Sequence, residues 1–181
     1  DIKIDLEMLS LASFLGIASI TGVGAAYFVV KHRETKFLSE FKFIKDKDKT
    51  PELCCLVVKK DWTALRYVPE NLITPEMCHL AVIENSSALK YIPENLKTLE
   101  LCRLAVEKDG YMLEYVPDQM KTSELCRVAV ANYGNMLKFI PENLITPELC
   151  RLAVAYSGHA LDYVPEKFKT PELRRVAAED N

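Results

Sequence analysis

A threonine recurs every 24 residues along most of the chain, with no insertion or deletion between successive copies. It stands at Thr50, Thr74, Thr98, Thr122, Thr146 and Thr170. A short fixed period is typical of a solenoid, in which each repeat packs only against its neighbours. We therefore expect an array over residues 36–181, with a degenerate cap (36–49), five full repeats (50–169) and a half-repeat cap (170–181).

Each repeat begins with residues that favour the start of a helix, as in Thr146-Pro147-Glu148. Threonine is a good N-cap, proline suits the first helical position, and glutamate complements the positive end of the helix dipole. In the third repeat, the apolar residues between 101 and 106 cover a broad arc, as expected for a helix packed on both sides. We predict that this helix ends near Gly110 with glycine in the left-handed conformation.

The second half of each repeat is predicted to be a short segment that ends before a proline, followed by a turn of 3₁₀ helix. Thr63, Ser87 and Asn135 are candidate caps for the short segment. The residues that the 3₁₀ turns would place in the core are Leu72, Leu96, Met120, Leu144 and Phe168. No alternating pattern of strands occurs, so this part is predicted to be all-α, a short right-handed α-solenoid of 24-residue helix/3₁₀ repeats.

Residues 8–30 contain no charged side chain. As a helix they would extend about 34 Å, enough to cross a hydrocarbon core of about 30 Å. We therefore predict that residues 1–35 form a single N-terminal transmembrane anchor; a buried helix of a soluble protein is the alternative. Basic residues follow at once, which places the N-terminus outside and the repeats on the matrix or cytoplasmic side. The lipid bilayer is thus an expected partner.

Small residues in this segment are spaced by four, at Ala18, Gly22 and Ala26. Such a face lets membrane helices approach closely, which predicts helix packing against other subunits. The alternative is that Gly and Ala are simply common in membrane helices.

Five of the six cysteines share one repeat position: Cys54, Cys78, Cys102, Cys126 and Cys150. Equivalent atoms of stacked helices lie about 10 Å apart, beyond the roughly 7 Å between Cα atoms that a disulfide tolerates. We predict buried, reduced thiols in a reducing compartment.

The sequence contains no Gly-rich phosphate loop, no CxxC or HExxH motif and no nucleophile paired with a base. Its three histidines have no second metal ligand at helical spacing, and its net charge of −3 disfavours nucleic acid as a partner. We therefore predict neither an enzyme nor a binder of cofactors, metals, small-molecule substrates or nucleic acid.

Two groups of residues are candidates for contacts with other proteins. Arg103, Arg127 and Arg151 each follow a glutamate by three residues, which predicts either a salt ladder along each helix or a binding stripe. The second group departs from the repeat. Trp62 stands where later repeats have glycine, and Arg66 and Lys90 share a position whose charge changes sign along the chain. Trp62 is either an interface anchor or folds back onto the first repeats.

The motifs Thr-Pro-Glu-Leu-Cys at 146–150 and Tyr-Val-Pro-Glu at 67–70 and 163–166 resemble a bacterial and protist family of short repeats described as a domain of unknown function. The resemblance covers roughly 50–178, and the period is similar to that of leucine-rich-variant solenoids. It implies a helical solenoid of the protein-interaction kind, without catalytic residues.

These features predict a non-catalytic, single-pass accessory or scaffold subunit of a multi-subunit membrane complex, with other protein subunits as partners. Such repeats occur in protists and the sequence does not begin with Met, which favours a respiratory assembly of the mitochondrial inner membrane. The alternative is a membrane-anchored bacterial adaptor or host-interaction protein that recruits a soluble partner through the repeats.

Overall fold

The computed structural model describes residues 41–179, in which α-helices alternate with 3₁₀ helices and no strand occurs. The α-helices are α4 (Pro51–Lys60), α5 (Pro75–Glu84), α6 (Leu99–Lys108), α7 (Ser123–Asn132), α8 (Pro147–Tyr156) and α9 (Pro171–Glu179). The longer 3₁₀ helices are η2 (Trp62–Tyr67), η4 (Ser86–Tyr91), η6 (Gly110–Tyr115), η8 (Gly134–Phe139) and η10 (Gly158–Tyr163). The 3₁₀ turns are η1 (Asp46–Asp48), η3 (Glu70–Leu72), η5 (Glu94–Leu96), η7 (Asp118–Met120), η9 (Glu142–Leu144) and η11 (Glu166–Phe168).

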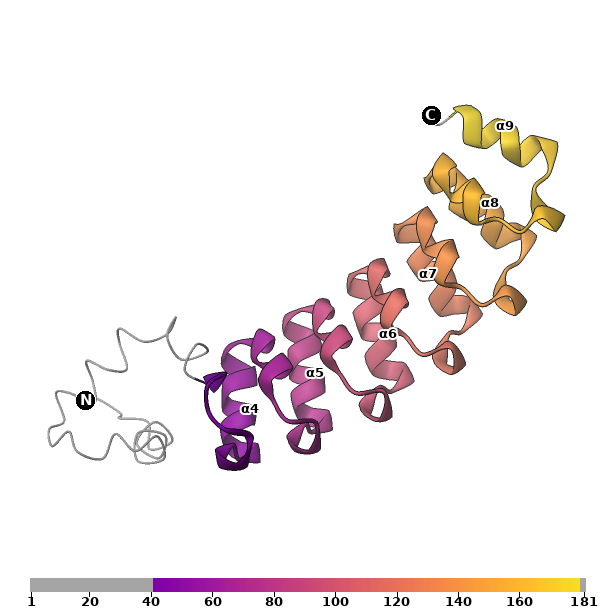
Figure 1. The fold of residues 1–181 in the computed structure, drawn as a ribbon. Helices are drawn as coiled ribbons and strands as arrows, with labels where there is room; N and C mark the ends of the chain where they lie inside the picture. Colours follow the sequence, from indigo (N-terminus) through magenta and orange to yellow (C-terminus); the bar gives the residue numbers. More distant parts are fainter. Residues whose placement is uncertain (1–40, 180–181) are drawn as a thin grey trace, which may run out of the picture.

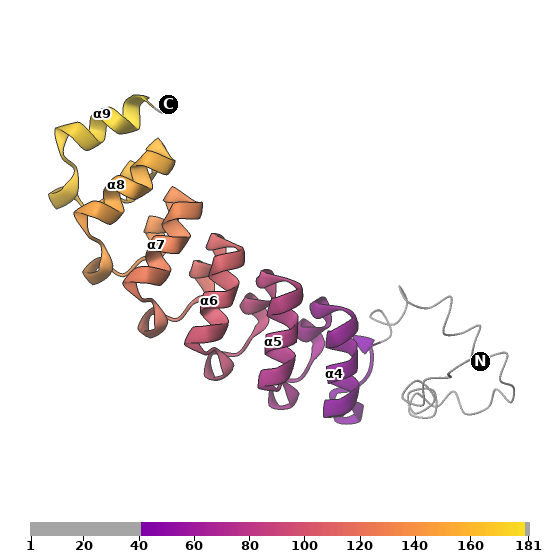
Figure 2. The same cartoon turned by 180° about the vertical axis from the view of Figure 1, so that it is seen from behind.

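The repeats form an elongated, curved array (Figure 1). Helices α4 to α9 stand side by side in chain order, and their axes rotate along the array so that α9 is steeply inclined to α4. The opposite view shows the same order of elements (Figure 2). Each repeat therefore meets mainly the repeats before and after it, as a solenoid requires.

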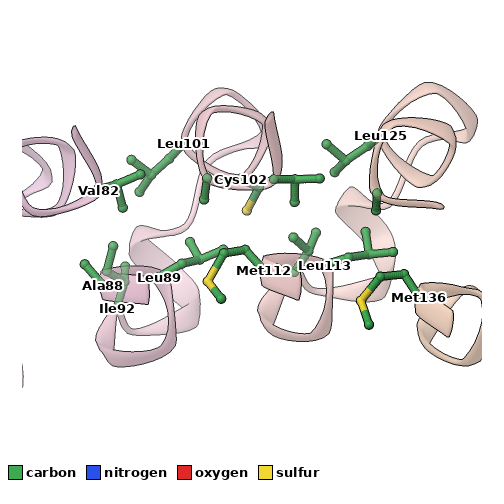
Figure 3. Close-up of a cluster of buried hydrophobic side chains, with 14 of the residues drawn as sticks. Val82, Ala88, Leu89, Ile92, Leu101, Cys102, Met112, Leu113, Leu125 and Met136 are labelled. Atoms are coloured by element: carbon green, nitrogen blue, oxygen red, sulfur yellow. The ribbon is translucent and has the colours of Figure 1, made fainter. Parts of the chain in front are cut away.

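The core lies between a layer of α-helices and a layer of 3₁₀ helices (Figure 3). In the third repeat, Leu101 and Cys102 of α6 face Met112 and Leu113 of η6, and all four side chains are buried. At the start of the described residues, Phe41 is buried at the position that Leu65 and Leu89 occupy in the next two repeats. Leu72 and its equivalents in the short 3₁₀ turns were predicted to lie in the core. They are half-buried and pack against it instead.

Threonine begins each α-helix as expected from its side-chain chemistry. The Thr50 hydroxyl accepts a hydrogen bond from the Leu53 N–H at 3.3 Å, and the equivalent bond recurs in α5 to α9. The caps of η2 and η4 lie two residues before the predicted Thr63 and Ser87, and the prediction of Asn135 as a cap is wrong because η8 has no side-chain cap. The Asp61 carboxylate accepts from the Thr63 N–H, and Asn85 and Asp109 accept in the same way from the residues two positions later.

The glycines are required for close packing and not, as predicted, for a left-handed helix end. Asp109 ends α6 in the extended region (φ −152°), and Gly110 starts η6. A Cβ at Gly110 would lie 2.9 Å from the Ala129 carbonyl oxygen in the next repeat. The approach is closer still at Gly158, 2.5 Å from the Ala177 oxygen, and closest at Gly134. Glycine therefore allows η6, η8 and η10 to touch the backbone of the following α-helix.

Lysines just before the capping threonines join consecutive repeats, a feature that the sequence reasoning missed. The Nζ of Lys49 donates to the Tyr67 carbonyl at 2.6 Å, and those of Lys97 and Lys121 donate to the Tyr115 and Phe139 carbonyls at 2.7 Å. Each carbonyl belongs to the last residue of a 3₁₀ helix, where a cation is favourable. Ile73 and Ile145 occupy this position before Thr74 and Thr146, and Lys169, before Thr170, pairs with Glu166 instead.

The predicted fold class of a transmembrane helix followed by a solenoid is corrected to an all-α array of repeats. No helix among residues 41–179 is long and apolar enough to cross a membrane. The α-helices have at most 10 residues, whereas a bilayer requires about 20. The predicted span 8–30, with Ala18, Gly22 and Ala26, lies outside the described residues.

All six cysteines are free, as predicted, and the five that share a repeat position are fully buried. Burial raises the pKa of the Cys54, Cys78 and Cys126 thiols to about 11. These thiols therefore stay protonated at neutral pH and act as small apolar side chains.

Candidate protein-interaction surface

Basic and aromatic side chains alternate along the 3₁₀ layer of the first repeats. We call the set Lys42, Phe43, Arg66, Tyr67, Lys90 and Tyr91 the basic-aromatic ridge. Its members are three consecutive copies of one dipeptide position, 24 residues apart. The three cations are exposed, as is 77% of Phe43, while the two tyrosines are half-buried.

The cations of the ridge lie over aromatic rings. The Arg66 guanidinium carbon is 5.0 Å from the ring centre of Tyr91 in the next repeat and 5.8 Å from that of Tyr67. The Lys90 Nζ is 4.8 Å from the Tyr91 ring centre, and the Lys42 Nζ is 4.9 Å from that of Phe43. Because a ring positions a cation without neutralising it, these charges stay available to an anionic partner.

Trp62 lies beside the ridge instead of standing out as an isolated anchor. Its ring centre is 6.4 Å from that of Tyr91, and its half-buried side chain packs against the core. This placement agrees with the alternative in which Trp62 folds back onto the first repeats. The contact brings three candidate residues, Trp62, Arg66 and Lys90, around the single ring of Tyr91.

A groove of about 290 Å³ opens next to Tyr91, between the first and second full repeats. Its apolar lining includes Leu65, Val68, Ile73 and Ile92. Ile73 holds the position at which Lys49, Lys97 and Lys121 bridge their repeats. The groove therefore lies where the longer lysine side chain and its bridge are absent.

Charged residues also border this groove: Arg66, Lys90 and the carboxylate of Glu70. Among the ion pairs of residues 41–179, none includes Arg66 or Lys90.

The arginines of the helix ladder (Arg103, Arg127 and Arg151) differ from the cations of the ridge because each pairs with a glutamate of its own helix. Arg127 lies 2.9 Å from Glu124, and Arg151 lies 3.1 Å from Glu148, as the i, i+3 spacing predicted. Arg103 pairs instead with Glu107, one turn onward, at 3.4 Å.

The pKa values of two glutamates in the ladder are also lowered. The hydrogen bond from Arg127 is the main cause of the lowered pKa of Glu124, whereas a backbone hydrogen bond is the main cause for Glu148. The structure thus separates the candidate residues into a self-neutralised ladder and a ridge with unpaired charge.

The ridge ends at the third full repeat. Glu114 follows Lys90 at the same repeat position, so the sign of the charge reverses there. Lys138 again lies over a ring, 4.6 Å from the centre of Phe139, but Asp162 comes next. Consecutive positive charges therefore occur only at the N-terminal end of the described array.

A tyrosine cluster on the later repeats was missed by the sequence reasoning. The ring centres of Tyr111 and Tyr133 are 4.1 Å apart, and both side chains are exposed. Tyr133 stands where Asp61, Asn85 and Asp109 cap the preceding 3₁₀ helices, and η8 has no side-chain cap. The loss of a capping residue to an exposed tyrosine was a signal available in the sequence.

Comparison with known proteins gives one family. Residues 74–121 match a family described as a domain of unknown function, DUF4116, which corresponds to the second and third full repeats. No curated protein and no solved structure matches the chain significantly. Within residues 41–179, no group of three His, Cys, Asp or Glu side chains is arranged to hold a metal ion.

Proposed function

We propose that this chain is a non-catalytic scaffold subunit whose repeats bind other proteins. The observation that carries the proposal is the basic-aromatic ridge, where Arg66 and Lys90 lie over Tyr91 without a carboxylate partner among the described residues. Arginine and aromatic side chains are enriched at protein interfaces, and here they occur together on an exposed surface.

The architecture supports the same proposal. The interior is apolar, with Lys49 as the one buried charged residue of 41–179, and that lysine bridges two repeats. An elongated array presents a larger continuous surface than a globular domain of the same length, which is how solenoids bind other proteins. The membrane setting was predicted from the segment 8–30, which lies outside the described residues, so the proposal is limited to the repeats.

Affinity purification of the full chain at native expression, followed by size analysis and mass spectrometry, tests this proposal. We expect a complex of fixed composition in which the chain and its partners are stoichiometric. Exchange of several partners at low occupancy would favour the adaptor function. A chain that elutes alone, at its monomer size of 20.5 kDa, would contradict both.

A further inference from the structure

We infer that the basic-aromatic ridge binds an extended acidic peptide segment of a partner protein, with an apolar side chain of that segment in the groove beside Ile73. This inference rests on the proposed scaffold function and specifies its partner chemistry. It is carried by the unpaired cations of the ridge, by their spacing and by the groove between them.

Charge selects an acidic ligand. Lys42, Arg66 and Lys90 form a positive row on a protein whose net charge is −3. No ion pair within residues 41–179 neutralises Arg66 or Lys90, while the helix arginines are paired internally. Carboxylates that approach Arg66 and Lys90 would thus find cations already oriented by Tyr91. Pre-oriented groups lose less conformational freedom on binding.

Spacing selects an extended ligand. Equivalent residues of adjacent repeats are separated by about the diameter of a helix, roughly 10 Å. A polyproline II segment rises about 3.1 Å per residue and returns to the same face every third residue, after about 9 Å. Acidic residues at every third position would therefore reach successive cations of the ridge.

The groove selects an apolar residue between the acidic ones. The groove is open to solvent, with buried Leu65, Val68 and Ile92 behind the half-buried Ile73, and its volume of about 290 Å³ has room for one aliphatic side chain. Burial of such a side chain would add to the affinity that the charge pairs supply, and the charges would also determine orientation and association rate.

A nucleic acid is the other polyanion that cations and rings can bind, and the surroundings disfavour it. Glu70 borders the groove, and Glu94 and Glu114 follow on the same layer. A continuous phosphate backbone would pass close to these carboxylates, whereas a short peptide can place its charges only opposite the cations.

A titration with defined peptides tests the inference. The probe is a peptide of three Glu-Pro-Leu units, and its control has the same composition with the glutamates clustered at one end. Because Trp62 is the only tryptophan and lies beside Tyr91, its fluorescence reports occupancy. We expect saturable binding of the spaced peptide, about tenfold weaker binding of the control, and loss of affinity at about 1 M salt, where charges are screened beyond about 3 Å.

Three variants make the test specific. Arg66→Gln with Lys90→Gln should weaken the spaced peptide about tenfold, whereas Arg127→Gln with Arg151→Gln, which removes the same charge, should not. Ile73→Lys should fill the groove and bridge to the Tyr91 carbonyl, giving a protein at least as stable that binds the peptide less tightly. Equal binding by all variants, or tighter binding of an oligouridine than of the spaced peptide, would overturn the inference.

The same variants separate this inference from the proposed function. If the full chain with Arg66→Gln and Lys90→Gln still forms its native complex undiminished, the ridge is not the docking site, although the scaffold function stands. If the unmodified chain forms no complex, the scaffold function fails as well.

Discussion

The first two full repeats (50–97) and the next three (98–169) follow one plan but differ at the position that begins each longer 3₁₀ helix. Trp62 and Ser86 occupy it in the first group, and Gly110, Gly134 and Gly158 occupy it in the second. The glycines allow the 3₁₀ helix to contact the backbone of the next α-helix, whereas the junctions after Trp62 and Ser86 accommodate a side chain.

The same repeat can therefore serve two purposes, close contact with its neighbour and presentation of surface side chains. In the glycine repeats the next α-helix leaves no room for a Cβ at the start of the 3₁₀ helix. Helices α7 to α9 turn progressively away from α4 (Figure 1). The first repeats instead carry the ridge, Trp62 and the groove at Ile73. The glycine contacts and the basic-aromatic ridge thus lie in different parts of the described array.

High pH should have the largest effect, and it should affect both groups. Burial raises the pKa of Cys78 in the first group and of Cys126 in the second to about 11, against roughly 8.5 for an unfolded thiol. The folded chain therefore binds more protons between about pH 9 and 11, so the free energy of unfolding is fully present below this window and falls as pH rises through it.

Each of these two thiols should lower the free energy of unfolding by up to roughly 1.4 kcal/mol per pH unit in that window. Urea unfolding at a series of pH values measures the slope. Cys78→Ala and Cys126→Ala should each reduce it; an unchanged slope in both variants would show that the thiols are not the cause.

Adding a methyl group at each glycine tests whether the later repeats need glycine for contact with the next α-helix. Gly134→Ala forces a Cβ against the Ala153 carbonyl and should destabilise the array by about 2–3 kcal/mol. Gly158→Ala should cost less and Gly110→Ala least, in the order of their distances. Chemical denaturation provides the measurement, with Ser86→Ala as the control in the first group, expected within about 0.5 kcal/mol. A flat series would refute the packing role.

Removing a lysine bridge should have a smaller effect. Lys121→Met deletes the hydrogen bond to the Phe139 carbonyl, made by a side chain that is 7% exposed, and should cost about 1.5–2 kcal/mol. Lys138→Met removes an exposed lysine that lies only over a ring, so its thermal midpoint should change little. Equal shifts for the two variants would argue against the bridge.

The caps of the 3₁₀ helices should give the smallest effect. Asp109→Ala removes the acceptor for the Tyr111 N–H and should destabilise the chain by about 1 kcal/mol. Ser157→Ala changes the same repeat position where no side-chain cap exists, and should be close to neutral. Denaturant midpoints compare the two; a Ser157→Ala cost as large as that of Asp109→Ala would contradict the assignment.

The 24-residue period was sufficient to predict the threonine caps, the buried cysteines and the alternation of α and 3₁₀ helices. It could not reveal the lysine bridges, because Lys121 bonds to a carbonyl 18 residues later and isoleucine replaces the lysine in two repeats. Glycine after a helix is compatible with both a left-handed end and a close backbone contact, and only the stacking of repeats distinguishes them.

The candidate surface was partly predictable. Variation in charge at one repeat position singled out Arg66 and Lys90, and the structure places both side chains on the surface, outside the ion pairs of residues 41–179. Their assembly around Tyr91 and the groove at Ile73 depends on the distance between repeats, which a linear sequence does not contain. The ladder at Arg127 and Arg151 was equally visible in sequence, but its pairing with glutamates separates it from the ridge.

Site-specific photo-crosslinking tests the central claim most directly. A benzoylphenylalanine replaces Tyr91 on the ridge in one full chain and Tyr163 in another, the same repeat position at the far end of the array. We predict that the partner is crosslinked through position 91 and much less through position 163, although Tyr163 is the more exposed residue. Equal crosslinking at the two positions, or crosslinking at 163 alone, would contradict the assignment of binding to the first repeats.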